Sequence, residues 1–222
     1  AGVRGAFAAS RECARVRLYE RNVNLGKNLF ITGKGRCNIT NACDMEELLE
    51  SVVSNSKFLF SSFYGFTNQN MLELLESQGV QLKVERGSRV FPRSDKSSDV
   101  IAALASLMKK EGVEIQLQAE AHGLVIQDKA VRGIRLGSQV EKADRVIVTT
   151  GGLSYPTTGS TGDGYRWAQE CGHQITDLSP ALVPFVTAEA DTVKDLQGLA
   201  LRNVETSVYS GKRELYREMG EM

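Results

Sequence analysis

The residues best suited to bind a ligand form the run 32–41, Thr-Gly-Lys-Gly-Arg-Cys-Asn-Ile-Thr-Asn. Its glycines permit positive φ angles and let a ligand approach the backbone closely. Lys34 and Arg36 are charged donors, and a guanidinium can hold a phosphate through two parallel hydrogen bonds. With a single aliphatic residue, the run is poor material for a core helix or strand. It predicts a loop around an anionic, polar ligand, the alternative being a surface turn with solvated cations.

A second candidate lies at the amino end, where Gly2 and Gly5 precede a predicted helix and a strand ending at Glu20. This is the second half of the Gly-x-Gly-x-x-Gly dinucleotide-binding pattern, whose first glycine and first strand would precede Ala1. Gly2 would let the backbone approach a pyrophosphate, and Gly5 would let the helix pack closely. Glu20 would accept hydrogen bonds from an adenosine ribose. The alternatives are a chance pair of glycines and a solvated glutamate.

A third candidate follows the apolar run 145–149, which predicts the clearest buried strand of the chain. Residues 150–164 are rich in Gly, Ser and Thr, with Asp163 as the one charge, and lead into a predicted helix. Ligands of open α/β sheets bind beyond the carboxyl ends of the strands. Long glycine-rich loops are usually functional, so we expect a binding loop here rather than a simple connection.

The elements that must position these loops alternate along the chain. We expect a loop at Gly2 leading into a helix that reaches Cys13. Further helices are predicted at 44–53, 68–78, 98–110 and 164–171. Strands are predicted at 15–20, 80–85, 113–117, 123–126, 130–136 and 145–149. This order favours an α/β fold with a largely parallel sheet. After Pro180, strands at 183–187 and 204–209 with no helix between them indicate a second, β-rich element.

Composition limits the classes of partner. The 222 residues carry 27 Lys and Arg against 27 Asp and Glu, so nothing favours nucleic acid or an anionic membrane surface. The four cysteines and two histidines lack metal-ligand spacing, which predicts no metal site and fits a reducing cytoplasm. No apolar run is long enough for a membrane span, and no secretory signal is visible. No Gly-x-x-x-x-Gly-Lys-Ser/Thr motif is present, which argues against a nucleotide hydrolase.

Five segments together resemble one family in the family's own order: 31–41, 89–96, 150–156, 159–165 and 180–184. The chain is similar to the YhiN/BaiN-like flavoproteins, also labelled the aminoacetone oxidase family of FAD-binding enzymes. The resemblance implies a Rossmann-like FAD-binding domain of the two-dinucleotide-binding-domain type at 1–183, with its first strand missing. Residues 184–222 would then begin an inserted, β-rich substrate domain. It further implies an FAD-dependent oxidoreductase that exchanges electrons with NAD(P)H or oxygen and acts on a small organic molecule.

The same resemblance implies which residues contact FAD. Gly2 and Gly5 match the pyrophosphate glycines, and Glu20 matches the adenosine-ribose acid. Ala121 lies where a backbone contact to adenine is expected. The implied cofactor-binding set is Gly2, Gly5, Glu20, Arg21, Gly26, Lys27, Thr32, Gly33, Arg36, Cys37, Asn38, Ala121, Thr150, Gly151 and Gly152.

The chain also departs from the family's pattern. Members extend further at the carboxyl end, so this chain is expected to be an internal piece, and a non-catalytic fragment unable to bind FAD is the alternative function. Arg4 stands where a small residue is usual, which predicts crowding beside the pyrophosphate. Cys37 has no partner at Cys-x-x-Cys spacing, which favours a packing role over a redox role. The sequence assigns no catalytic acid or base, no substrate and no oligomeric state.

Overall fold

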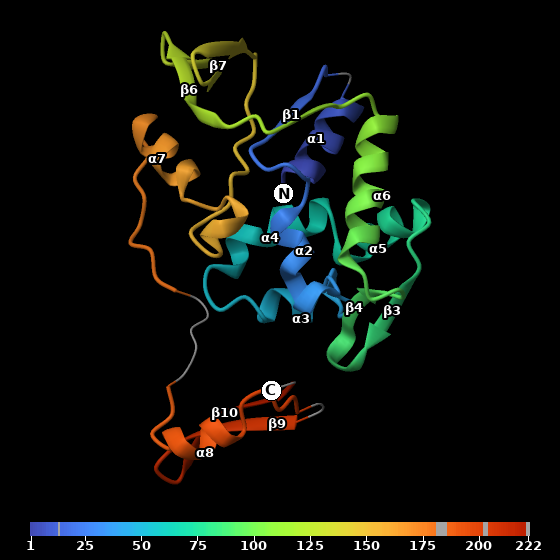
Figure 1. Ribbon diagram of the computed structural model, residues 1–222, viewed down its shortest axis with the longest axis vertical. Coiled ribbons are helices and arrows are strands. Elements are labelled where there is room, and N and C mark those ends of the chain that lie inside the picture. The colour runs from blue at the N-terminus through green and yellow to red at the C-terminus, as the bar shows by residue number, and fades with distance from the viewer. Residues whose placement is uncertain (13, 181–185, 202–203, 221–222) are drawn as a thin grey trace. The chain divides into compact units, whose positions relative to one another are not determined.

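The computed structural model describes residues 1–12, 14–180, 186–201 and 204–220, which form two compact units, Ala1–Ile175 and Thr176–Met222. The boundary predicted between 183 and 184 and the helix end predicted at Cys13 lie outside the described residues. The predicted α/β class is confirmed, since helices and short sheets alternate through the first unit (Figure 1).

The long helix α6 (Ser97–Lys110) packs on α1 (Gly2–Arg11). After α6 the chain enters β5 (Glu114–Leu117), which pairs in parallel with β1 (Arg17–Glu20). The buried side chains of Ala6, Met108 and Val113 form the core between these elements. The parallel pair and its covering helices therefore fix the direction in which β1 ends.

The opposite half of α6 packs on a second set of elements: α2 (Lys27–Ile31), α5 (Asn68–Ser77) and an antiparallel sheet with strand order β2 (Thr40–Asn41), β4 (Arg89–Pro92), β3 (Leu82–Glu85). Two 3₁₀ turns, Thr32–Gly35 and Arg86–Ser88, accompany them. The core here consists of Cys37, Leu75, Val80, Val100 and Ala103. One rigid helix thus supports both halves of the unit.

Side chains cap the starts of α3 (Met45–Glu50) and α5. Asp44 caps α3 by accepting a hydrogen bond from the backbone N–H of Glu47 at 2.9 Å, as the sequence predicts, although the helix ends earlier than expected. Thr67 and Asn70 form a capping box at the start of α5. The sequence did not predict α4 (Ser56–Gly65), an apolar helix with no buried residue.

A three-stranded antiparallel meander follows β5: β6 (Ala121–Gln127), β7 (Ala130–Leu136) and β8 (Gln139–Lys142). The helix α7 (Asp163–Glu170) contributes Trp167, which is buried with Leu124 and Ile134. A short 3₁₀ turn, Pro156–Thr158, lies in the loop before α7. This packing attaches the glycine-rich segment before α7 to the meander.

The second unit contains α8 (Ala190–Asp195) and an antiparallel hairpin of β9 (Val204–Ser210) and β10 (Arg213–Gly220). The strand predicted at 204–209 is confirmed. The sequence predicts no helix between residues 187 and 204, and this prediction is wrong because α8 lies in that segment. Most of the strand predicted at 183–187 falls on residues that the structure does not describe.

Three further expectations are wrong. Residues 145–149 form no strand, and Ile147 is 60% exposed, because no neighbouring strand in the described chain pairs with this segment. The sheets are not largely parallel: short turns such as Asp128–Lys129 join neighbouring strands as hairpins, which forces antiparallel pairing. Gly2 and Gly5 lie within the helix α1 rather than in a loop before it.

An ion-pair cluster ties the 3₁₀ turn after α2 to β3 and the loop after β4. The guanidinium of Arg36 pairs with Glu85 and, at 2.9 Å, with Asp95, and it stacks 4.2 Å from the centre of the Phe91 ring. Lys83 joins the same two carboxylates at 3.1 and 2.6 Å. Hydrogen bonds from Lys83 and then Arg36 hold the pKa of the Asp95 carboxyl below its usual range.

Replacing the core residue Leu75 with alanine tests the packing of α5 on α6. Leu75 is fully buried, so Leu75→Ala should lower the free energy of unfolding by about 2–5 kcal/mol. Urea unfolding followed by the fluorescence of Trp167, the one tryptophan of the chain, measures the change. The control is Val53→Ala, at a fully exposed position, which should change stability by less than about 0.5 kcal/mol. Equal effects of both substitutions would refute this description of the core.

The ion-pair cluster predicts a pH-dependent stability. A carboxyl whose pKa is lowered by folding stabilises the protein above its unfolded pKa, about 3.9, and this contribution is lost as the pH falls through the folded pKa. Asp95→Asn should therefore be less stable than the parent at neutral pH, with the difference closing as the pH falls below that unfolded value. The control is Asp128→Asn, an exposed position with a similar left-handed backbone. A difference that does not shrink in acid would contradict the role of Asp95.

Candidate functional site

Two consecutive side chains connect the end of β1 to the loop before α7. Arg21 donates from Nη1 to the carbonyl oxygen of Gly159 at 3.3 Å and to Thr161 Oγ1 at 3.0 Å, and it pairs with Glu120 through Nη2. Asn22 donates from Nδ2 to the carbonyl oxygen of Thr158 at 2.9 Å. The loop is therefore held against the carboxyl end of β1, where ligands of α/β folds bind.

The carboxylate of Glu20 is oriented by its neighbour. Its Oε1 accepts hydrogen bonds from the backbone N–H of Asn22 at 2.9 Å and from Asn22 Nδ2 at 2.7 Å. No hydrogen bond within the described ranges reaches Oε2. Ala119 donates its backbone N–H to the carbonyl oxygen of Glu20 at 3.0 Å, which brings Ala121, two residues later, close to this strand end.

The start of α1 packs closely against the segment before the glycine-rich loop. A Cβ added to Gly2 would lie 2.8 Å from Thr149 Oγ1, a separation that real Cβ atoms essentially never show. A Cβ on Gly5 would lie 3.6 Å from two carbon atoms of Ile147, which is ordinary contact. Only glycine therefore fits at position 2 as the structure stands.

The loop that follows is folded on itself. Gly151 has a φ of 80°, and a Cβ there would lie 2.5 Å from Ser160 Oγ, so both backbone angle and space require glycine. The carbonyl oxygen of Gly152 accepts the N–H of Gly162 at 3.1 Å. The hydroxyl of Thr150 is buried and has no hydrogen-bond partner in the described part of the chain. A buried hydroxyl without a partner is a candidate ligand contact.

The run 32–38 lies elsewhere in the unit. Arg36 belongs to the ion-pair cluster with Glu85 and Asp95, so its Nε and Nη2 are already engaged. Cys37 is buried in the core, where burial raises the pKa of its thiol and a hydrogen bond with Thr32 opposes the rise. This environment matches the packing role that the sequence favours for Cys37. Gly33 and Asn38 are exposed.

The structure thus brings together some of the predicted site residues and not others. The end of β1, the start of α1 and the Thr150–Gly152 segment converge through Thr149 and the loop before α7. No hydrogen bond or ion pair in the described chain joins them to the run 32–38. Gly26 and Lys27 begin α2, where a Cβ on Gly26 would lie 3.0 Å from Ile101 of α6.

Sequence reasoning missed two polar residues of this site, Asn22 and Glu120. A short amide directly after the acid that ends a strand was the signal for Asn22, because such side chains often bond nearby backbone or side-chain groups. Nothing in the local sequence marked Glu120, whose partner Arg21 lies far away along the chain.

The sequence predicts that Arg4 crowds the start of α1, but the side chain points to two aromatic rings instead. Its guanidinium stacks 3.9 Å from the centre of the Phe66 ring and 5.4 Å from that of Phe7. Burial, followed by repulsion from Arg11, lowers the pKa of Arg4. The side chain therefore links α1 to the end of α4.

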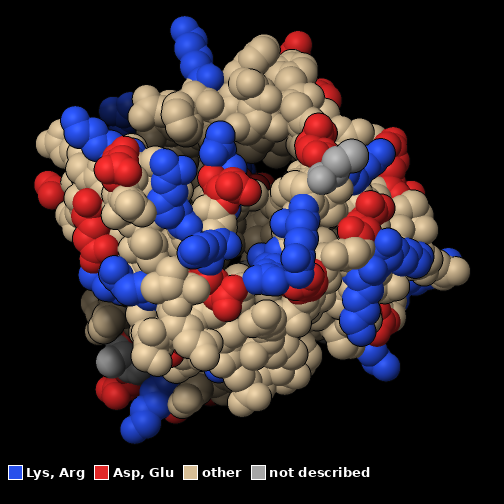
Figure 2. Space-filling model, turned by 90° about the horizontal axis from the view of Figure 1, so that it is seen from above, with Lys and Arg blue, Asp and Glu red and all other residues tan. Residues whose placement is uncertain are grey.

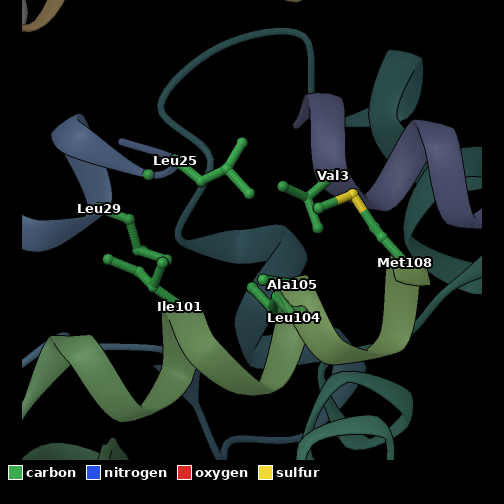
Figure 3. A pocket seen from close by; sticks show the side chains of 8 residues that line it. Val3, Leu25, Leu29, Ile101, Leu104, Ala105 and Met108 are labelled. Atoms are coloured by element: carbon green, nitrogen blue, oxygen red, sulfur yellow. The ribbon is translucent and has the colours of Figure 1, made fainter. Parts of the chain in front are cut away.

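A small apolar pocket lies between α1, α2 and α6 (Figure 3). Val3, Leu29 and Met108 point into it together with side chains of α6. Its volume of about 20 Å³ and its wholly apolar lining suit at most a small packing defect of the core. It is too small for a nucleotide.

Charge is evenly mixed over the molecular face shown in Figure 2, where basic and acidic side chains alternate. Within the described ranges, no group of three or more His, Cys, Asp or Glu side chains is arranged to hold a metal ion. A search of the same ranges finds no helix with the length and apolar character needed to span a membrane.

Comparisons with known proteins identify the family. The model of the HI0933-like protein Rossmann domain matches residues 1–215. Over 223 aligned residues the chain is 30% identical to the 3-dehydro-bile acid delta(4,6)-reductase of Clostridium scindens, covering 100% of this chain and 53% of that protein.

Two further relatives carry a different name. Ribosomal RNA dihydrouridine synthases of Haemophilus influenzae and Escherichia coli are 28% and 26% identical, covering 90% and 98% of this chain. The matches cover 51% and 54% of those two proteins, so the chain spans about half the length of the curated relatives it matches. The family match over nearly the whole chain confirms the resemblance to the YhiN/BaiN-like flavoproteins, and the chain belongs to the HI0933-like Rossmann-domain family.

Proposed function

We propose that this chain is the FAD-binding part of an FAD-dependent oxidoreductase. The observation that supports the proposal best is the convergence of three features: the close contact of Gly2 with Thr149, the Glu20 carboxylate at the end of β1, and the folded Thr150–Gly152 segment. These are the features that hold the pyrophosphate and the adenosine ribose in dinucleotide-binding folds.

The donor set of the site fits the adenosine half of FAD. Glu20 Oε2 has no hydrogen-bond donor in the described structure, so a ribose hydroxyl can donate to it. The absent Cβ of Gly2 lets Thr149 approach the start of α1, so the segment before the glycine-rich loop lies beside the helix N-terminus where a pyrophosphate would bind. The buried Thr150 hydroxyl, which lacks a partner among the described residues, is suited to a polar group of the cofactor. Arg36 and Cys37 act indirectly in this proposal, because both side chains are engaged in the ion-pair cluster and the core.

FAD when bound supplies hydride chemistry, and the residues described here bind and orient it. The names of the relatives, a reductase and a dihydrouridine synthase, both denote addition of hydrogen. They support reduction of a substrate, and we propose NAD(P)H as the electron donor. We propose a small organic molecule rather than RNA as substrate, because the chain has no net charge and both signs of charge occur on the face shown in Figure 2.

The alternative, a non-catalytic piece that does not bind FAD, has one observation in its favour. Segment 145–149 is exposed and unpaired in the described structure, although it adjoins the predicted cofactor site. A measurement of flavin binding separates the two functions. A cytoplasmic location remains a prediction of the cysteine content alone.

Titration of the protein with FAD and with FMN, followed by flavin fluorescence, tests the proposal. FAD should bind at least about tenfold more tightly than FMN, since only FAD carries the adenosine that Glu20 would hold. A protein that unfolds cooperatively by Trp167 fluorescence and yet shows no saturable FAD binding would establish the non-catalytic alternative.

Replacing Glu20 tests the ribose contact itself. Glu20→Ala should weaken FAD binding by roughly 1–3 kcal/mol, the usual loss when a charged hydrogen-bond partner is removed. FMN binding should not change, because FMN has no adenosine ribose. Glu46→Ala, at an exposed position on α3, is the matched control and should bind both flavins as the parent does. An unchanged FAD affinity in Glu20→Ala would refute the assignment.

A further inference from the structure

Asn22 lies at a junction that the predicted set of cofactor contacts does not include. Its Nδ2 donates one hydrogen to Glu20 Oε1 at 2.7 Å and the other to the carbonyl oxygen of Thr158 at 2.9 Å. Both partners are acceptors, so the amide nitrogen, and not its oxygen, must face them. The side chain therefore bridges the acid at the end of β1 and the loop before α7.

The bridge also determines which oxygen of Glu20 remains for a ligand. The backbone N–H and the amide of Asn22 both bond Oε1, which leaves Oε2 without a donor in the described chain. A carboxylate held through one oxygen presents the other in a fixed direction. Two hydrogen bonds to one oxygen also limit rotation of the carboxylate plane.

Arg21 holds the same loop through separate contacts. It bonds the carbonyl oxygen of Gly159 and Thr161 Oγ1, and its guanidinium lies between Glu120 and Asp163, with Asp163 Oδ2 at 3.5 Å. Its charge is therefore already balanced by protein carboxylates. Asn22 differs from Arg21 because it alone touches both the loop and Glu20.

We propose that Asn22 is a positioning residue for the adenosine ribose, which aims Glu20 Oε2 at the ribose and fixes the distance between Glu20 and Thr158. The proposal rests on the proposed FAD binding. It assigns to Asn22 a role in affinity for the adenosine half of the cofactor and none for the flavin half.

The first test is the substitution Asn22→Ala, with Asn24→Ala at an exposed neighbouring position as its matched control. Asn22→Ala should weaken FAD binding about tenfold, while FMN binding and the FAD affinity of Asn24→Ala stay as in the parent. In the protein without added flavin, amide hydrogen exchange in the 157–161 segment should become faster by about tenfold. An unchanged FAD affinity in Asn22→Ala, or an equal loss of FMN affinity, would overturn the proposal.

The second test uses Asn22→Asp, in which a carboxyl group of similar shape faces Glu20. The neighbouring charged groups are those of Arg21, Glu120, Asp163 and Arg166, which are ion-paired with one another. Two carboxylates at hydrogen-bond distance do not both ionise readily, so the pair should hold a proton in mild acid. The single O–H of the protonated pair then joins the two carboxyl groups and restores one of the two hydrogen bonds that the amide donates.

The expected signature is a change of FAD affinity with pH. Relative to the parent at each pH, Asn22→Asp should bind FAD about tenfold more weakly near pH 8 and recover part of this loss near pH 5. A role of Asn22 in general stability alone would not produce this recovery, so a pH-independent deficit overturns the proposal. A parent that folds but binds no FAD refutes the proposed function instead, and the hydrogen-exchange measurement still judges the bridge from Asn22 to Thr158.

Discussion

The burial of the apolar face of α6 is the constraint on which the first unit depends. Val100 and Ala103 near its start pack with Cys37 and Leu75, while Met108 near its end packs with Ala6. A helix of 14 residues is about 21 Å long and effectively rigid. The hydrophobic effect therefore fixes the run 32–38 and the amino-terminal helix relative to one another without any direct polar contact between them.

Polar contacts between side chains and loops then fix the positions of the loops on the elements that the core holds together. At the end of β1, Arg21 and Asn22 both donate hydrogen bonds to the loop before α7. Asn22 also donates to the carboxylate of Glu20. The ion-pair cluster of Arg36 with Glu85 and Asp95 likewise holds the 3₁₀ turn after α2 in place. Arg36, which the sequence motif presents as a phosphate ligand, is in the fold engaged with two protein carboxylates. Its contribution to a bound cofactor would come through the shape of the loop.

Much of the fold could be predicted from local chemistry. Asp44 as a helix cap, the end of α5 before Gly79 and the end of α6 before Gly112 all follow from interactions within a few residues. The exposed segment 145–149 and the unpredicted helix α4 show the limit. An apolar run becomes a buried strand only where neighbouring strands pair with it, and periodicity carries no information about such neighbours.

The sequence by itself determined the family, the α/β class and the glycine-rich segments, because these depend on residue types at fixed short spacings. Only the tertiary structure decided which segments meet. It placed Thr149 against Gly2, Asn22 against Thr158 and Glu120 beside Arg21, and it moved Arg36 into an ion-pair cluster. These contacts join residues 49 to 147 positions apart in the chain. They follow from how the apolar faces of helices and strands are buried together, which no local pattern specifies.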